Sequence, residues 1–297
     1  MASVREGPVL ASASLRERIR SADLVVFNCE SLVSDRPFIG ALVFVMSQAF
    51  LERCLEALGI DPAKTIVSVA NNHIHDRGPA GCEELIGRLE GLGLTPIGAR
   101  AGNRTPIVTI ERHGLRLGFS AWTEWMNRDR HPALCSVWRP KTIDEAVAAS
   151  TSTCDTLIGF PHWDYEFCHF PTAATVARAH RLIDEGFSLL VGHHPHVLQP
   201  IEKRGSGFCQ YSLGNLTPMP ARIAHWATML GAMLEVRLAG SSSVHPGRVT
   251  AYDVVPIFEI RTGRSLALRE VEELPARLRA KIDRRLALLF PPRQVAR

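Results

Sequence analysis

Four short apolar runs in this chain each end in polar side chains of the types that bind metals. The runs cover residues 23–28, 64–70, 156–160 and 187–191, and segments with helical periodicity separate most of them. Apolar runs of this length are typical of buried strands, and their alternation with helices predicts an α/β fold. Sites in such folds form at the carboxyl ends of strands. The four polar clusters are therefore expected to lie together.

The last cluster contains three histidines within four residues. His193, His194 and His196 follow the run 187–191 directly, after Gly192. Glycine lets the backbone turn sharply and approach another group closely, and Pro195 fixes one dihedral angle of the bend. In a bent backbone, His194 and His196 can point to one place, and neutral imidazole is a common ligand of transition metals. A polar loop that is merely rich in histidine is the alternative.

The other clusters supply carboxylate and amide oxygens as well as imidazole. Asn28 and Glu30 follow the first run, Asn72 the second and His162 the third. This mixture suits Mn, Fe or Zn, and two such metals can activate a water and hold the oxygens of a phosphoryl group or carbonyl. Glu30 is the one carboxylate at these strand ends that could bridge two metals. Singly, each cluster has an ordinary explanation as a turn, a helix cap or a packed imidazole, but their joint occurrence favours a metal centre.

Residues beside the predicted ligands suggest further roles. His73 is suited to protonate a leaving group, with Asp76 three residues on to orient its ring. Glu166 and Glu202 are candidates to orient ligand imidazoles, although surface carboxylates explain them equally well. The Trp-, Arg- and Pro-rich segment 124–140 is predicted to be a surface insertion or lid.

The remaining pattern predicts one domain over residues 1–297, with a core at about 21–260 and a C-terminal helix within 272–290. Residues 1–12 are expected to be irregular. A hairpin is predicted over 106–121, and alternating segments predict antiparallel strands later in the chain. Helices are expected at 14–21, 48–58, 80–92, 143–149, 172–185 and 274–289, and strands at 94–98, 207–213, 229–238 and 248–258.

Composition excludes several classes of protein. The net charge of +4 is mild for 34 basic and 30 acidic residues, and no nucleic-acid-binding motif is present, so no nucleic-acid partner is expected. Neither a signal-peptide core nor an apolar run long enough to cross a membrane occurs. Seven cysteines without a CxxC pair do not form a disulfide framework and fit a reducing compartment. A cytoplasmic location is predicted. The oligomeric state is not specified by the sequence.

Five ordered motifs between about residues 21 and 217 resemble the CapA-type poly-γ-glutamate capsule proteins, which look like a branch of the calcineurin-like metallophosphoesterases. Asn28-Cys29-Glu30 matches the family's NxE. The other motifs are Asn71-Asn72-His73-Ile74-His75-Asp76-Arg77-Gly78, His162-Trp163-Asp164-Tyr165-Glu166, Gly192-His193-His194-Pro195-His196 with Gln199-Pro200-Ile201-Glu202, and Tyr211-Ser212-Leu213-Gly214-Asn215.

The resemblance implies a four-layer α/β/β/α sandwich that carries two divalent metals. It implies that Glu30 bridges the metals and that His73 is the acid. Asn72, His162 and His194 would bind one metal, and His196 the other. Asn28 and Asn215 belong to matched motifs and are expected beside the metals or the substrate.

Two departures from the family pattern matter. Family members begin with a strand ending in Gly-Asp, and that Asp is a ligand of the first metal. Residues 1–12 contain neither an Asp nor an apolar strand pattern, so one strand and one metal site are expected to be incomplete. One hypothesis places the true start upstream of Met1, which the upstream codons would test. The family's Gly after His-Trp is replaced by Asp164, which would narrow the pocket or add a carboxylate.

These features predict a metal-dependent hydrolase that uses a metal-activated water on a phosphoester or an acyl or amide bond. The substrate would be a small molecule or of polyglutamate type. The alternative is a non-catalytic binding or scaffold protein that keeps the fold with an incomplete metal site. The missing Asp favours the scaffold, whereas His73, His194 and His196 favour the enzyme.

Overall fold

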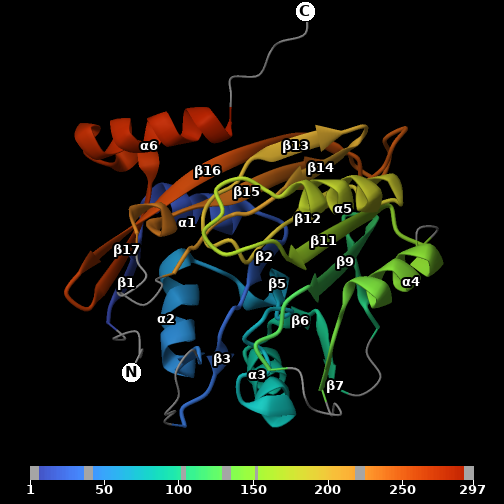
Figure 1. The fold of residues 1–297 in the computed structure, drawn as a ribbon, viewed down its shortest axis with the longest axis horizontal. Coiled ribbons are helices and arrows are strands. Elements are labelled where there is room, and N and C mark those ends of the chain that lie inside the picture. The colour runs from blue at the N-terminus through green and yellow to red at the C-terminus, as the bar shows by residue number, and fades with distance from the viewer. Residues whose placement is uncertain are drawn as a thin grey trace, which may run out of the picture.

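Two β-layers packed face to face form the centre of the molecule (Figure 1). The computed structural model describes residues 7–36, 43–101, 105–128, 135–150, 153–217 and 225–290. The larger sheet has the strand order β13-β14-β12-β11-β9-β8. Its inner strands are parallel, and the outer β8 and β13 are antiparallel to their neighbours. The strands are β8 (Ile107–Arg112), β9 (Leu115–Thr123), β11 (Thr156–His162), β12 (Leu189–Val191), β13 (Ile201–Arg204) and β14 (Gly207–Gln210).

The second β-layer consists of two sheets. One is parallel, with the order β2-β5-β6, and the other has the order β1-β17-β16-β15. Both contribute side chains to the apolar core shared with the six-stranded sheet, for example Val26 of β2 and Leu234 of β15. The strands are β1 (Val9–Ala11), β2 (Val25–Asn28), β5 (Thr65–Ser68), β6 (Thr95–Ile97), β15 (Leu230–Leu238), β16 (Val249–Thr262) and β17 (Ser265–Glu270).

Helices cover the outer faces of both layers, which completes the four-layer α/β/β/α sandwich expected from the sequence. Helices α4 (Pro140–Ser150) and α5 (Ala173–Asp184) pack on the six-stranded sheet. Helices α1 (Ala13–Ser21), α2 (Gln48–Leu58) and α3 (Gly78–Gly91) cover the second layer. Helix α6 (Ala276–Leu289) packs with its own cluster at the end of β15 and β16 (Figure 1).

Local signals in the sequence explain where these helices begin and end. The side chains of Ser12, Ser47 and Thr172 accept hydrogen bonds from the first turns of α1, α2 and α5. Gly59 ends α2 in a left-handed conformation with φ +69°, which glycine adopts without strain. The apolar face predicted for α5 is confirmed, because Val176, Ala179, Leu182 and Ile183 belong to one core cluster.

The structure corrects several details of the predicted elements. Residues 1–12 were expected to be irregular, but Val9–Ala11 forms β1, which pairs in parallel with β17. Strand β17 was not predicted. The predicted strand 248–258 in fact extends to Thr262 as β16, and it then turns back and pairs with β17 as a hairpin. Within the predicted insertion 124–140, Cys135–Val137 forms β10 and pairs with β7 (Ala99–Ala101). A further short pair is β3 (Leu32–Val33) with β4 (Val45–Met46).

Strand β2 lies at the edge of its sheet in the described part of the chain. It is hydrogen-bonded to β5 on one side, and the described residues place no strand on its other side. Strand β1 does not fill this place, because it pairs with β17 in the neighbouring sheet. The described residues thus contain no further strand paired with β2.

Candidate metal centre

Three ligand-type side chains from the two β-layers meet at one point. Glu30 follows β2, while His194 and His196 follow β12 of the six-stranded sheet. One ligand atom of each lies within 4.8 Å of the other two, and this is the one such group of three among the described residues. The Nε2 atom of His196 lies 3.5 Å from Glu30 Oε1. The expected convergence of these polar clusters therefore occurs between the two sheets.

His162, at the end of β11, joins this group from the six-stranded sheet. Its Nε2 lies 3.7 Å from Glu30 Oε1 and 3.0 Å from Asn72 Oδ1. Its ring centroid lies 4.6 Å from that of His194. Asn72 comes from the loop after β5, so each of the four predicted clusters contributes at least one side chain.

The spacing of these atoms fits a metal better than direct hydrogen bonds. Ligands bound at about 2.1 Å and separated by about 90–110° lie roughly 3.0–3.4 Å apart, close to the separations of the two imidazole nitrogens from Glu30 Oε1. The atoms Glu30 Oε1 and His194 Nδ1 are buried and have no hydrogen-bond partner among the described residues. Buried polar atoms are normally paired. The residues present therefore fit a divalent metal of the Mn, Fe or Zn type.

Burial lowers the pKa of two imidazoles of this site, His162 and His194, and so favours the neutral form that binds metals. Burial lowers the pKa of His194 to about 3, with the neighbouring His196 and His73 adding to the effect. The pKa of His162 is held well below its usual value, first by burial and then by the surrounding histidines. Burial raises the pKa of Glu30, whereas the charges of His196 and His73 oppose that rise. A cation here would favour the ionised form of Glu30.

The histidine loop adopts an unusual backbone. His194 has φ +98° and His196 has φ +58°, in the left-handed region that non-glycine residues rarely adopt. The surrounding backbone holds the loop, because Trp163 N donates to His193 O and His193 N donates to Pro161 O. Strain of this kind persists where the surrounding structure over-determines it, and it is common at functional sites. Here it directs two alternate side chains to the same side.

Gly192 permits the close approach that the sequence suggested. A Cβ atom at this position would lie 1.9 Å from Tyr211 O and 2.5 Å from Trp163 Nε1. Trp163 Nε1 donates to the same Tyr211 carbonyl at 3.0 Å. The histidine loop is thus packed directly against β14 and the segment after His162, with no space for a side chain between them.

His73 and Asp76 form a buried pair beside the ligands. His73 Nδ1 lies 2.8 Å from Asp76 Oδ2, which also accepts a hydrogen bond from Phe44 N. Phe44 stacks on the imidazole, with ring centroids 4.0 Å apart. A hydrogen bond from Nδ1 to the carboxylate leaves Nε2 as the atom able to exchange a proton with a substrate. Asn71, a possible helix cap, instead donates to Cys29 O and accepts from His73 N.

Asn28 and Asn215 lie beside the candidate ligands. Asn28 Nδ2 donates to Glu30 Oε2 at 3.4 Å. Asn215 Oδ1 lies 3.0 Å from His196 Nδ1, and the same side chain donates to Thr228 O. These contacts fix the orientation of a carboxylate and an imidazole, as partners of metal ligands commonly do.

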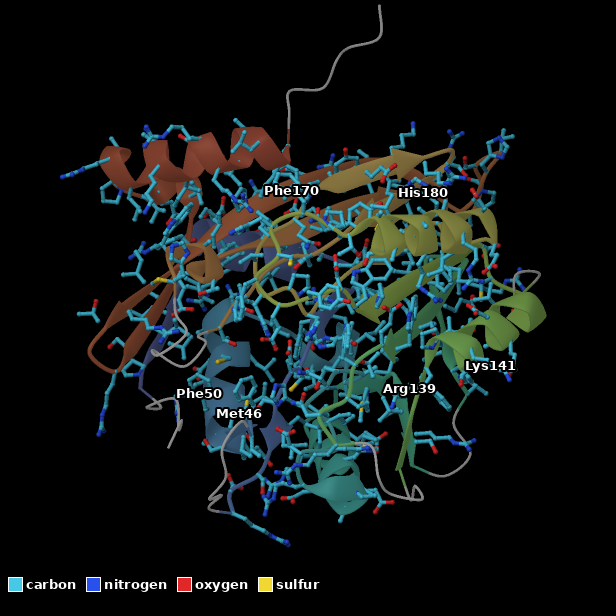
Figure 2. All side chains as sticks on the ribbon, in the orientation of Figure 1. Met46, Phe50, Arg139, Lys141, Phe170 and His180 are labelled. Atoms are coloured by element: carbon cyan, nitrogen blue, oxygen red, sulfur yellow. The ribbon has the colours of Figure 1, made fainter. Side chains whose placement is uncertain are left out.

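The two glutamates considered as orienting groups lie in different places. Glu166 is exposed, and its charge contributes to the raised pKa of Glu30. Glu202 lies on β13, where Tyr211 Oη donates to it and His180 Nε2 lies 2.8 Å away (Figure 2 labels His180 on α5). The prediction that Glu202 orients a ligand imidazole is corrected, because its bound histidine, His180, lies on α5 and is not one of the predicted ligands.

Asp164, which replaces the family's glycine, also differs from expectation. It is buried with φ +67°, and its Oδ2 accepts from Thr172 N at the start of α5. Its carboxylate is thus engaged with the helix start and does not join the candidate ligand group among the described residues.

Two further residues are neighbours of the site: Asn127, which the sequence did not single out, and Trp125, which it suggested as a cleft or lid residue. Asn127 Nδ2 lies 3.3 Å from His73 Nδ1, and its Oδ1 accepts from Asn72. Trp125 lies beside His194, with ring centroids 6.2 Å apart. Both belong to the segment 124–140 that was predicted to be a surface insertion or lid. Its tryptophans and polar residues were the one sequence feature that could have indicated a role at the site.

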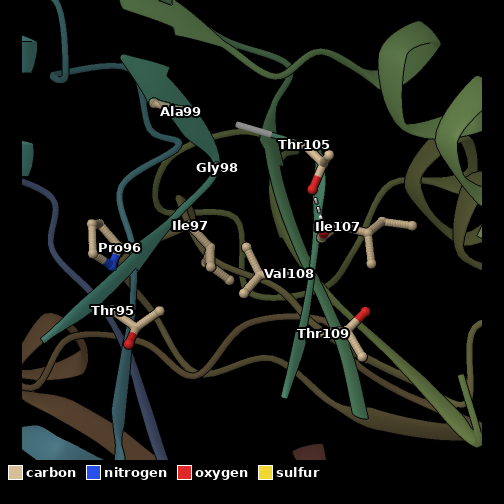
Figure 3. A pocket seen from close by; sticks show the side chains of 9 residues that line it. All are labelled: Thr95, Pro96, Ile97, Gly98, Ala99, Thr105, Ile107, Val108 and Thr109. Carbon is tan, nitrogen blue, oxygen red and sulfur yellow. Dashed lines mark hydrogen bonds between the residues drawn. The ribbon is translucent and has the colours of Figure 1, made fainter. Parts of the chain in front are cut away.

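A surface pocket lies away from this centre. It has a volume of about 530 Å³ and is lined by residues 95–99, 105 and 107–109, between β6 and β8 (Figure 3). Its lining is largely apolar and contains none of the candidate metal ligands. The pocket therefore adds nothing to the chemistry of the metal centre.

The layers and strand order define an α/β sandwich with a metallophosphoesterase-like fold. A phosphatase from Mycoplasma pneumoniae has a similar structure, with a TM-score of 0.50 and 13% identity, covering 85% of this chain and 91% of that chain. At that identity the similarity shows the fold alone. The model of the bacterial capsule synthesis protein family PGA_cap matches residues 7–218, and the chain belongs to this family. The resemblance seen in the sequence is confirmed.

Two relatives with known names match about half of the chain. The capsule biosynthesis protein CapA of Bacillus anthracis is 29% identical over 162 residues, which cover 51% of this chain and 39% of that protein. The PGA biosynthesis protein CapA of Bacillus subtilis (strain 168) is 26% identical over 159 residues, or 51% of this chain and 42% of that protein. The chain thus spans about two fifths of the length of these relatives. No helix among its described residues is long and apolar enough to span a membrane.

Proposed function

We propose that this protein is a metal-dependent hydrolase acting on a phosphoester. The observation that carries the proposal is the meeting of Glu30, His194 and His196 from two sheets, with the His73–Asp76 pair beside them. A bound divalent metal supplies a water of lowered pKa and polarises the oxygens of the scissile group. Acyl or amide compounds of polyglutamate type are the second substrate class, supported by the names of the CapA relatives. A cytoplasmic location is part of the proposal.

In this proposal each residue of the site has a distinct role. Glu30, Asn72, His162, His194 and His196 would hold metal, and Glu30 would be the ligand shared if two ions bind. Asn28 and Asn215 keep the carboxylate and one imidazole in orientation. His73 donates a proton to the leaving oxygen from Nε2, while Asp76 holds Nδ1 and stabilises the charged ring. Burial of the ligands excludes bulk water and strengthens these interactions.

Metal binding tests the proposal directly. After chelation, adding Mn²⁺, Fe²⁺ or Zn²⁺ should raise the melting temperature. An ion that binds only the folded state, at a concentration of 100 times its Kd, adds about 2.7 kcal/mol to the free energy of unfolding. For a chain of this size that corresponds to roughly 5 °C. Elemental analysis after dialysis should recover one or two ions per chain. No shift and no recovered metal would refute the proposal, whereas metal without hydrolysis of any phosphoester or γ-glutamyl compound would favour the scaffold alternative.

The His73–Asp76 pair gives a second test. Asp76→Asn should lower kcat about 10- to 100-fold, part of the 10²- to 10⁴-fold typical of general acid–base catalysis, because the amide no longer stabilises a charged imidazole. Metal content and KM should change little, since Asp76 bonds His73 and Phe44 rather than a candidate ligand. The measurement is kcat across pH.

A matched control for this substitution is Asp144→Asn. Asp144 lies on α4 and pairs with Arg181, away from the candidate ligands. This variant should keep both kcat and its pH profile. An Asp76→Asn enzyme with wild-type kcat at every pH would remove His73 from the role of acid.

A further inference from the structure

Exposed aromatic side chains gather beside the metal centre. Trp125 is 39% exposed, Tyr165 56% and Phe167 38%, although large aromatic side chains usually find cover in a folded protein. Trp122 and Trp163, close in sequence to this group, are fully buried. The exposure is therefore particular to the two segments that flank the candidate ligands.

These rings contact each other and the candidate ligands. The Trp125 and Tyr165 ring centroids lie 5.5 Å apart at an interplanar angle of 50°. Trp125 lies 6.2 Å from the His194 ring, and Phe167 lies 5.9 Å from the His196 ring. Trp125 and Tyr165, here called the aromatic shelf, thus continue outward from His194 to the surface.

Backbone constraints hold both parts of the shelf in place. Trp125 N donates to Thr123 Oγ1, which donates in turn to Trp125 O, and Glu124 N donates to His162 O. Tyr165 follows Asp164, whose carboxylate is fixed at the start of α5. A rigid pair of exposed rings loses little freedom when it binds a ligand.

One of the two carboxylates next to the shelf is paired within the protein. Glu124, next to Trp125, is paired with Arg178 at 3.2 Å. Glu166, which follows Tyr165, is exposed. The tilt between the two rings lets a third flat ring stack on one of them and meet the other at its edge, which is the usual packing of aromatic groups.

We infer that the aromatic shelf of Trp125 and Tyr165 binds a flat aromatic ring that is part of the substrate, next to the group that is hydrolysed. The inference rests on the proposed function, and it narrows the substrate class to phosphoesters that carry such a ring. A purine nucleotide and a benzyl ester are representatives of that chemistry.

Paired substrates test the inference with the metal-reconstituted full chain. AMP and ribose 5-phosphate share one scissile bond and differ by the base, and benzyl and ethyl phosphate form a second pair. The ring-bearing member should have a kcat/KM about tenfold higher, since stacking on an aromatic side chain is worth about that factor or more. Tyr165→Ala and Trp125→Ala should reduce this preference to within about twofold. Tyr165 is not one of the candidate ligands, so its variant should keep full metal content.

Phe170→Ala is the matched control. Phe170 is 52% exposed in the same loop region, but it lies beside Arg285 of α6 and not in the shelf (Figure 2). This variant should keep the preference for the ring-bearing substrates. Loss of the preference in Phe170→Ala to the same extent would overturn the assignment to Trp125 and Tyr165.

A binding measurement separates this inference from the proposed function. Adenosine and benzyl alcohol, which carry no phosphate, should quench the fluorescence of the exposed Trp125, and Trp125→Phe should remove the signal. Quenching without hydrolysis of either phosphoester pair would support the shelf and refute the phosphoesterase proposal. Equal hydrolysis within both pairs, with no quenching, would overturn the shelf and leave the phosphoesterase proposal standing.

Discussion

Replacing His194 by alanine should remove metal binding and lower hydrolysis by roughly 10³-fold or more, because a bound metal supplies several kcal/mol of transition-state stabilisation. His194 lies in the candidate ligand group with Glu30 and His196, and its buried Nδ1 has no other partner among the described residues. Alanine keeps the Cβ atom, so the left-handed backbone at φ +98° is equally strained in both proteins. The measurements are metal content after dialysis and kcat/KM on the best phosphoester.

His245→Ala is the control for this substitution. His245 is an exposed histidine in the loop between β15 and β16, outside the candidate ligand group. It should keep full metal content and activity. A His194→Ala protein that retains its metal and hydrolyses substrate at the wild-type rate would exclude His194 as a ligand and, with it, the present account of the site.

Gly192→Ala should lower the free energy of unfolding more than the addition of a methyl group to any other glycine near the site. The added Cβ would lie 1.9 Å from Tyr211 O and 2.5 Å from Trp163 Nε1, and the first of these is backbone. The loop must move away from β14, which would break the bond from Gly192 N to Gln210 O. We expect a loss of about 3 kcal/mol or more, as for severe overpacking, or no soluble folded protein.

Gly240→Ala separates steric overlap from the general cost of changing glycine. A Cβ at Gly240 would meet nothing within 4 Å. Its free energy of unfolding should stay within about 0.5 kcal/mol of wild type. Urea unfolding of the two variants gives the comparison. Equal midpoints would show that the histidine loop is free to move away from Tyr211 without cost.

The sequence predicted the site better than it predicted the sheets. Each strand end that carried a polar cluster does bring a side chain to the Glu30 group, because strand direction and the carboxyl-end rule depend on local pattern alone. The partner of Glu202 could not be predicted in the same way. Its contact with His180 depends on how α5 lies over β13, which only the packed structure determines.

Pairing between distant segments explains the remaining errors. Val9–Ala11 has too few residues to show strand periodicity, and it becomes a strand because Leu266–Leu268 offers it a parallel edge. Asn127 belongs to no recognised motif. A hydrogen bond from its backbone N to Asn72 O holds it at the site. Local patterns carry no information about such contacts, since these depend on chain segments far apart in sequence.

The candidate centre lies across the boundary between the two β-layers. Glu30 and Asn72 come from one layer, while His162, His194 and His196 come from the other. An ion held by both sets would act as a cross-link between the two β-layers. If the ion stayed bound in the unfolded chain, it would close a long loop and reduce the number of conformations open to that chain. The same ion would make separation of the layers and loss of the catalytic geometry a single event. Catalytic activity and the contact between the two β-layers would then depend on the same few metal–ligand bonds.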